Sequence, residues 1–325
     1  MITLYQLHWS HYVEKVRWAL DYKGVTWTAV DVDPYTKREM RHLGRKTTLP
    51  SGSTLYTVPT IHDEATASVI GESSEILAYL ERTYPTPALY PEDAAERAQV
   101  ARWMVWLDST LGLAARRLAY TQIALEHPGY LAELFLPELV RSGAAETLKA
   151  RFVGAIMAGV LAQRFRFVHN RTDRVFEQLE ECLLFAARRL SAHHYLVGDR
   201  FTAADLTLAA LLRPVRLVPC FRDDPRFKHL FAWRAKLLQE HRRERPAGYE
   251  SAMHEIRGRR GWELGAVKWL PESRSTESRE LTEVPDLPAA RNDQQPVRRF
   301  PLITGPIWYV RLVVSCGLGR TDYPR

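Results

Sequence analysis

Hydrophobic and polar positions repeat with two different periods over the first 85 residues of the chain. Short apolar or alternating runs predict strands, and apolar residues spaced three to four positions apart predict helices. On this pattern we place strands at 2–8, 25–32, 58–61 and 67–70, and helices at 12–23, 37–43 and 73–82. The strand–helix–strand start implies a parallel pair, and the two later strands are close enough to form an antiparallel hairpin. The pattern therefore predicts a mixed sheet with helices packed on it.

The period changes after Tyr84-Pro85-Thr86-Pro87, a sequence typical of a break between elements. From there the chain is almost continuously helical in pattern, with one apolar stripe running from 175 to 190 at helical spacing. Thr202 and Asp205 have the spacing of a capping box, which marks the start of another helix. We expect residues 92–261 to form an all-helical domain.

The last part of the chain, residues 262–325, differs in composition. Residues 271–299 are rich in Pro, Glu, Ser and Arg and contain few large apolar side chains, which predicts a largely disordered tail. The apolar stretch at 300–318 contains prolines and the charged Arg311, which is costly inside a bilayer. We therefore do not expect a membrane anchor.

The overall composition, with 46% hydrophobic and 26% charged residues, is that of a globular protein. Three widely spaced cysteines indicate neither a disulfide framework nor a metal knuckle, and the first residues lack a secretory signal pattern. We therefore expect a cytoplasmic protein. The net charge of +7 favours anionic partners, but no recognised nucleic-acid motif accompanies the basic clusters, so a nucleic-acid partner is not expected.

Candidate chemistry gathers where predicted strands meet predicted helices. Ser10 follows the first strand, so its hydroxyl and the nearby backbone N–H groups would point towards a bound anion. A serine at this place is also typical of a helix N-cap, and the two roles are compatible. Tyr5 and Tyr12 are alternative hydroxyl donors, which we rank below Ser10 because they fall within the strand and the helix. Glu72 and Ser73 begin the helix that follows the hairpin.

Four motifs, in this order and spacing, resemble the glutathione transferase superfamily. They lie at 10–17, 58–61, 72–80 and 196–205. The first is similar to the serine-type classes, tau and zeta among them, although His11 stands where that motif usually has proline. The resemblance covers roughly residues 1–245. It implies a thioredoxin-like N-terminal domain with a mixed sheet at 1–85, followed by an all-helical C-terminal domain at 92–261.

The resemblance also implies an activity. Glutathione, bound as co-substrate, would ionise against Ser10 as the catalytic residue, and its thiolate would attack a hydrophobic electrophilic small molecule or a peroxide. Two alternatives stay open: a glutathione-dependent isomerase of the maleylacetoacetate type, and a non-catalytic binding protein on the same scaffold. A serine cannot form a mixed disulfide, so thiol exchange through Ser10 is excluded. The family likeness further implies a homodimer.

Lys46 is the candidate for the glycyl carboxylate of glutathione, by its charge and by its position on the loop between the first two motifs. From the matching motifs, Val58, before a cis Pro59, would offer its backbone to the cysteinyl part. Glu72 would pair with the ammonium group, while Ser73 and the helix N-terminus would hold the γ-glutamyl carboxylate.

Three further expectations concern the surroundings of Ser10. Trp106 and Thr110 come from the segment that lies beside the thiol in the family, so we expect them in the hydrophobic substrate pocket. The imidazole of His11 would either alter the local field or face solvent. His8 and His11 are three positions apart, but no nearby carboxylate or cysteine completes a ligand set, so no metal is expected.

Overall fold

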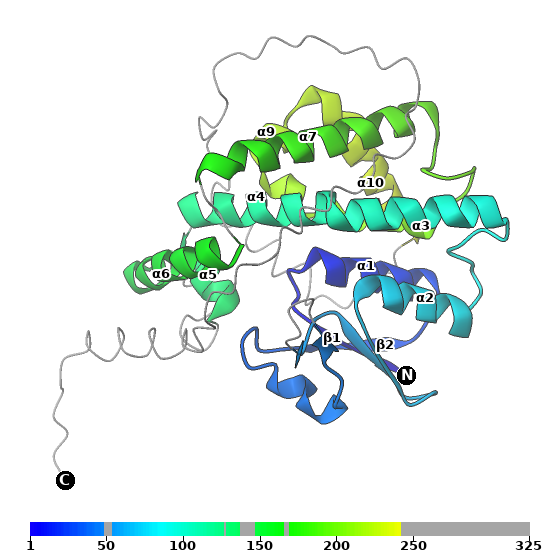
Figure 1. The fold of residues 1–325 in the computed structure, drawn as a ribbon, viewed down its shortest axis with the longest axis horizontal. Helices are drawn as coiled ribbons and strands as arrows, with labels where there is room; N and C mark the ends of the chain where they lie inside the picture. The colour runs from blue at the N-terminus through cyan, green and yellow to red at the C-terminus, as the bar shows by residue number, and fades with distance from the viewer. Residues whose placement is uncertain (49–53, 127, 137–146, 166–168, 242–325) are drawn as a thin grey trace. The chain divides into compact units, whose positions relative to one another are not determined.

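The computed structural model describes residues 1–48, 54–126, 128–136, 147–165 and 169–241 (Figure 1). The predicted tail at 262–325, and the end of the predicted helical domain beyond 241, lie outside the described residues. Everything below concerns the described part of the chain.

The N-terminal part contains the mixed sheet that the pattern predicts. Its strands are β1 (Ile2–Gln6), β2 (Trp27–Asp31), β5 (Thr60–Asp63) and β6 (Ser68–Gly71). The order across the sheet is β2-β1-β5-β6, with β1 parallel to β2 and the other neighbours antiparallel. A separate two-stranded pair, β3 (Thr47–Thr48) with β4 (Thr54–Leu55), was not predicted, because strands of two residues are too short to show a period.

Two helices pack on this sheet, α1 (His11–Tyr22) and α2 (Ser73–Thr83). Figure 1 shows both between the sheet and the long helices of the remainder of the chain. The helix predicted at 37–43 is instead the 3₁₀ helix η1 (Arg38–Leu43), bounded on each side by a left-handed residue, Lys37 and Gly44. Such short segments favour the tighter hydrogen-bonding pattern.

The rest of the described chain is helical. Its elements are α3 (Ala94–Ser109), α4 (Leu111–Glu126), α5 (Pro128–Phe135), α6 (Leu148–Phe165), α7 (His169–Ala192), α8 (Ala203–Leu211), η2 (Pro214–Leu217), α9 (Pro219–Arg222), η3 (Pro225–Phe227) and α10 (Lys228–His241). The capping box predicted at α8 is confirmed: Thr202 accepts from the backbone of the first turn, and the Asp205 carboxylate accepts from the Thr202 N–H at 2.9 Å.

One hydrophobic core runs from the sheet into the helices, because α1 packs against both α2 and α8.

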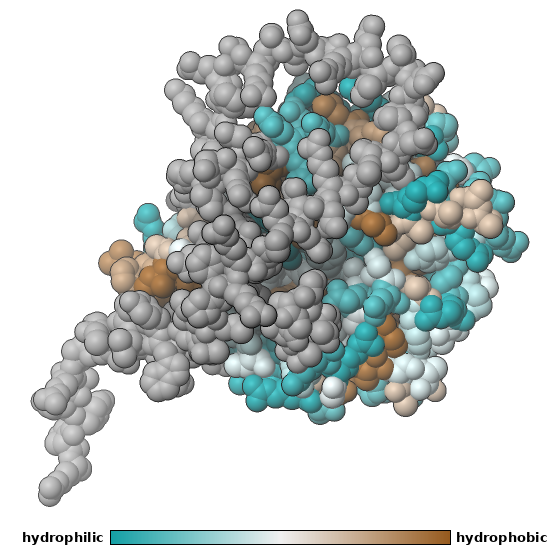
Figure 2. Space-filling model, viewed as in Figure 1, coloured by the Kyte–Doolittle hydropathy of each residue, from teal (hydrophilic) through white to brown (hydrophobic). Residues whose placement is uncertain are grey.

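At the α5–α6 end, Figure 2 shows hydrophobic surface. The side chains of Leu148 and Phe152 in α6 are 85% and 60% exposed. Among the described residues, no helix is both long enough and apolar enough to cross a lipid bilayer.

The first turn of α1 lies directly against the start of α4. The Tyr12 hydroxyl donates to the carbonyl of Asp108 at 2.8 Å, and a Cβ placed on Gly112 would overlap that hydroxyl. Gly112 is therefore required at this contact for reasons of space.

We predict that Gly112→Ala destabilises the protein. The added methyl group would push Tyr12 off α4, an overpacking effect of about 1–3 kcal/mol that exceeds the ~1 kcal/mol gained in helix propensity. Gly159→Ala is the matched control, because a Cβ on that helical glycine meets nothing within 4 Å. Urea unfolding of the two variants checks this. A Gly112→Ala variant as stable as Gly159→Ala would contradict the tight contact.

Candidate functional site

Strand register brings the candidate residues to one end of the sheet. Tyr5 near the end of β1 pairs with Thr60 at the start of β5, and Thr60 pairs with Gly71 at the end of β6. The segment after β1, the segment before β5 and the segment after β6 therefore emerge together. These segments carry Ser10, Val58–Pro59 and Glu72–Ser73 respectively.

Ser10 caps α1 and is half-buried. Its Oγ accepts from the Val13 N–H at 3.5 Å, and its own N–H donates to the Leu7 carbonyl at 2.9 Å. A hydroxyl that accepts one hydrogen bond still has its O–H to donate. The alternative hydroxyls have other contacts, since Tyr5 pairs with His42 at 3.1 Å and Tyr12 donates to the Asp108 carbonyl.

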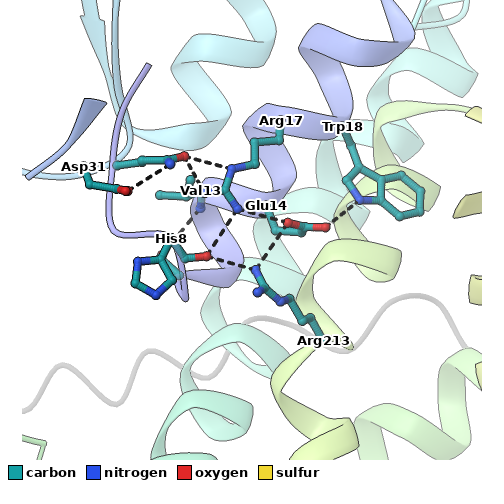
Figure 3. Close-up of polar contacts among 9 residues, drawn as sticks. His8, Val13, Glu14, Arg17, Trp18, Asp31 and Arg213 are labelled. Carbon is teal, nitrogen blue, oxygen red and sulfur yellow. Dashed lines mark hydrogen bonds and ion pairs between the residues drawn. The ribbon is translucent and has the colours of Figure 1, made fainter. Parts of the chain in front are cut away.

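A cluster of buried charges lies beneath the loop that carries Ser10 (Figure 3). Glu14 is 1% exposed, and one of its oxygens accepts from Trp18 Nε1 at 3.0 Å. The other oxygen meets two guanidinium groups, Arg17 at 3.4 Å and Arg213 at 3.3 Å. Arg17 also donates to the side-chain oxygen of Gln6 at the end of β1.

Both arginines of this cluster also hold the loop backbone. Nη1 of Arg17 and Nη1 of Arg213 each donate to the carbonyl of His8 at 3.2 Å, Arg17 from α1 and Arg213 from the turn between α8 and η2 (Figure 3). Burial lowers the pKa of His8, and the two guanidinium charges lower it further against the opposing effect of Asp31. The position of Ser10, two residues along, is thus tied to the end of α8.

His11 is buried and does not face solvent, which corrects one of the two expectations for it. Its Nε2 lies 3.0 Å from the carbonyl of Gly112, and because a carbonyl only accepts, Nε2 carries the proton. Burial lowers the pKa of His11 to about 3, and the charges of Arg116 and Arg213 act in the same direction. The imidazole is therefore neutral at physiological pH and joins α1 to α4.

The start of α2 has an unusual backbone. Glu72 is exposed, has a left-handed φ of 62°, and does not cap the helix with its side chain. Its carboxylate accepts from Thr57 Oγ1 at 2.9 Å, which links it to the segment before β5. The Val58–Pro59 peptide bond is cis, as the family resemblance implied. Ser73 is buried beside these groups.

A second buried polar cluster joins α1, α2 and α3. Lys15 is fully buried, and its Nζ donates to Ser74 Oγ and to Asp108 Oδ2, each at 2.8 Å. Ser74 also donates to the same carboxylate oxygen at 2.8 Å. Burial lowers the pKa of Lys15, and the Asp108 charge opposes that effect.

The remaining predicted residues have contacts of other kinds. Lys46 is exposed, with Nζ 5.6 Å from the centre of the Tyr56 ring. Trp106 is 5% exposed and packs edge-on against Phe185, and the Thr110 hydroxyl donates to the Trp106 carbonyl at 2.6 Å. These are the contacts of core residues, so a role in a substrate pocket stays a prediction.

Comparison with known families decides what this architecture is. Residues 4–88 match the model of the glutathione S-transferase N-terminal domain, and residues 170–236 match that of the glutathione S-transferase C-terminal domain. The chain belongs to the glutathione transferase superfamily. The predicted fold class, a thioredoxin-like part followed by a helical part, is confirmed with it. Among curated proteins, none matches the chain.

Two solved structures with TM-scores above 0.5 share the fold. The beta-etherase LigF from Sphingobium sp. strain SYK-6 has a TM-score of 0.53 and 20% identity, covering 78% of this chain and 99% of that one. GSTFuA3 from Phanerochaete chrysosporium has a TM-score of 0.52 and 22% identity, covering 74% and 95%. A theta-class transferase from Xanthomonas axonopodis pv. citri, with glutathione bound, is 28% identical over 77% of this chain and 96% of that one, with a TM-score of 0.46.

Sequence reasoning missed the partners that the helical part of this superfamily member supplies. Arg213 follows an apolar run and gives no local sign of its contact, because His8 is 205 positions away. Asp108 likewise reaches Lys15 across 93 positions. The only available signal was the presence of charged residues on an otherwise buried helix, since Glu14, Lys15 and Arg17 of α1 must find partners.

The neutral His11 gives the stability of this superfamily member a predictable pH dependence. Below about pH 6.5 the unfolded chain binds a proton at this residue that the folded chain, with its pKa of about 3, does not. Stability therefore falls as pH drops from about 6.5 towards 3, by up to ~1.4 kcal/mol per unit from this group.

Urea unfolding of the wild type and of His11→Gln, which keeps an N–H donor for Gly112, measures the effect. Relative to the variant, the wild type should lose about 3 kcal/mol between pH 7 and pH 4. Two stability curves that stay parallel over this range would show that His11 is not held neutral.

Proposed function

We propose that this protein is a serine-type glutathione transferase. In this proposal glutathione binds at the end of the sheet where the three segments converge, and the Ser10 hydroxyl donates to its sulfur. The thiolate so stabilised attacks a hydrophobic electrophilic small molecule or a peroxide. Division into domains at 1–85 and 92–261, a homodimeric state and a cytoplasmic location belong to the same proposal.

The observation that carries the proposal is the register of β1, β5 and β6. It brings together the Ser10 hydroxyl at the N-terminus of α1, the start of β5 and the N-terminus of α2. Glutathione needs such an arrangement, because it has a thiol at its centre, and an ammonium and a carboxylate on the γ-glutamyl side. Val58 would offer backbone N–H and C=O groups to the cysteinyl part, as in one more strand of the sheet.

Activation of the thiol requires stabilisation of its anion. A cysteine-like thiol has a pKa near ~8.5, and each unit of lowering needs about 1.4 kcal/mol of preference for the thiolate. A hydrogen bond to a charged group contributes ~1.5–3 kcal/mol, which corresponds to one or two units. The helix N-terminus at Ser10 acts in the same direction, because it favours a negative charge.

The γ-glutamyl end is assigned to the start of α2. There the first backbone N–H groups and Ser73 would hold the carboxylate, since helix N-termini favour anions. Glu72 would pair with the ammonium group, its carboxylate already oriented by the hydrogen bond from Thr57. The exposed Lys46 is assigned to the glycyl carboxylate. Trp106 and Thr110 remain the proposed members of the electrophile pocket.

The test of the proposal is the ultraviolet thiolate signal of bound glutathione across pH. In the wild type the thiol pKa should lie well below ~8.5, and Ser10→Ala should raise it by about one to two units. The exposed Ser191, which donates to the Arg188 carbonyl, provides the control Ser191→Ala, expected to match the wild type. A wild-type titration like that of free glutathione would make the protein a binding scaffold instead.

A separate measurement checks the ammonium contact. We predict that Glu72→Gln raises the dissociation constant of glutathione about tenfold, because a charge-assisted hydrogen bond becomes a neutral one. Calorimetric titration reports the constant directly. Glu75→Gln, one turn into the same helix and paired with Arg45 at 2.9 Å, is the matched control and should bind as the wild type does. Equal weakening in both variants would indicate a general charge effect in place of a specific contact.

A further inference from the structure

Ser10 is the last residue of a turn between β1 and α1. Its N–H donates to the Leu7 carbonyl at 2.9 Å, which closes a four-residue turn with His8 and Trp9 at its centre. The Ser10 Oγ lies 3.5 Å from the Val13 nitrogen, which is long for a hydrogen bond. The cap therefore holds the hydroxyl weakly, and the position of the hydroxyl depends on how the turn is held.

The helical part of the chain holds the two central residues of this turn in different ways. Arg213 donates to the His8 carbonyl at 3.2 Å, which fixes the backbone at the first of them. Trp9, the second, is held by its side chain, because its Nε1 donates to the Tyr120 hydroxyl of α4 at 3.2 Å. Peptide units are planar, so only φ and ψ of Trp9 separate the fixed His8 carbonyl from Ser10. The orientation of Trp9 therefore sets the direction in which the serine leaves the turn.

Aromatic packing supports the contact between Trp9 and Tyr120. Trp9 packs edge-on against Phe135 of α5, with ring centres 5.5 Å apart, and Tyr120 packs edge-on against the same ring at 5.8 Å. Phe135 is buried, and the other two rings are half-buried. The packing restricts the plane of the indole, and its single N–H donor selects the edge that faces α4. Together these contacts give Trp9 one orientation.

His11, on the other side of Ser10, also bonds to α4. Its Nε2 donates to the Gly112 carbonyl at 3.0 Å. Gly112 and Tyr120 are eight residues apart on α4, which corresponds to about 12 Å along the helix axis. Ser10 thus lies between two side chains that are anchored at separate points of one helix, and α4 serves as a rigid support for the serine.

We propose that Tyr120 is a positioning residue for the reaction, which acts through the indole of Trp9 to hold the Ser10 hydroxyl against the sulfur of bound glutathione. This inference rests on the proposed function and deepens it. A hydrogen bond weakens steeply as its angle departs from linearity, and a misplacement of about 1 Å can cost about a hundredfold in rate. Tyr120 needs no contact with glutathione for this role, because it sets the direction of the hydroxyl that makes the contact.

The thiolate titration of bound glutathione tests the inference with Tyr120→Phe. This substitution keeps the ring and removes the acceptor of the indole N–H. The pKa of the bound thiol should rise by about half a unit to one unit, since part of the stabilisation supplied by the Ser10 hydroxyl is lost. The pH profile of kcat/KM with a chloronitroarene should move upwards by the same amount. The dissociation constant of glutathione at acid pH, where the thiol stays protonated, should not change, because its two ends are assigned to other segments.

Two further variants make the test specific. Tyr22→Phe, the matched control, removes a half-buried tyrosine hydroxyl at the opposite end of α1, where it donates to the Ala88 carbonyl at 3.5 Å, and should match the wild type. Trp9→Phe should itself raise the thiol pKa. Tyr120→Phe added to Trp9→Phe should cause no further rise, because the hydrogen bond between the two residues is already absent.

The outcomes separate this inference from the proposed function. A lowered wild-type pKa that Tyr120→Phe leaves unchanged overturns the role of Tyr120 and leaves Ser10 in place. A wild-type pKa that is not lowered overturns both. The inference also fails if Tyr22→Phe gives the same rise, or if Tyr120→Phe raises the pKa as much in the Trp9→Phe background as in the wild type. Circular dichroism checks folding. If Trp9→Phe does not fold, Phe135→Leu replaces it, because it loosens the same indole from α5, and an unchanged thiol pKa in that variant then contradicts the inference.

Discussion

The buried carboxylate of Glu14 is the constraint on which the arrangement of this molecule depends. An isolated charge inside a protein is destabilising by several kcal/mol, so Glu14 requires cationic partners wherever α1 is buried. It obtains one from its own helix, Arg17, and one from the end of α8, Arg213. Removing one partner of such a pair typically costs about 3–5 kcal/mol, because the remaining charge is left buried. The same two guanidinium groups hold the His8 carbonyl, so the constraint on Glu14 also fixes the loop with Ser10.

The same need for partners applies to the other buried polar side chains of helix α1. It has no solvated face for its charged residues, since the sheet lies on one side and α8 on the other. Lys15 is therefore paired with Asp108 of α3, and His11 is kept neutral and bonded to the Gly112 carbonyl of α4. The polar side chains of the helix thus join it to several other elements. A site built at the N-terminus of α1 gains rigidity from contacts that are far apart in the sequence.

Much of the fold could be predicted from sequence, because the signals are local. Residues only a few positions apart determine the hairpin of β5 and β6, the helix N-cap at Ser10 and the capping box at Thr202. The errors have physical causes as well. The segment at 38–43 is too short, between two left-handed residues, to complete an α-helix. The expectation that His11 could face solvent was wrong. No local sequence pattern indicates that α4 covers this residue.

The sequence by itself determined the kinds of element, their order and the residue types at the start of α1 and α2. It also contained the family motifs that point to glutathione. Only the tertiary structure decided which charges meet, since Arg213 reaches His8 across 205 positions and His11 reaches Gly112 across 101. It alone packed Trp106 into the core, against Phe185. The reason is that caps and turns are set by neighbours in the chain, whereas the environment of a buried charge is set by whichever helix packs against it.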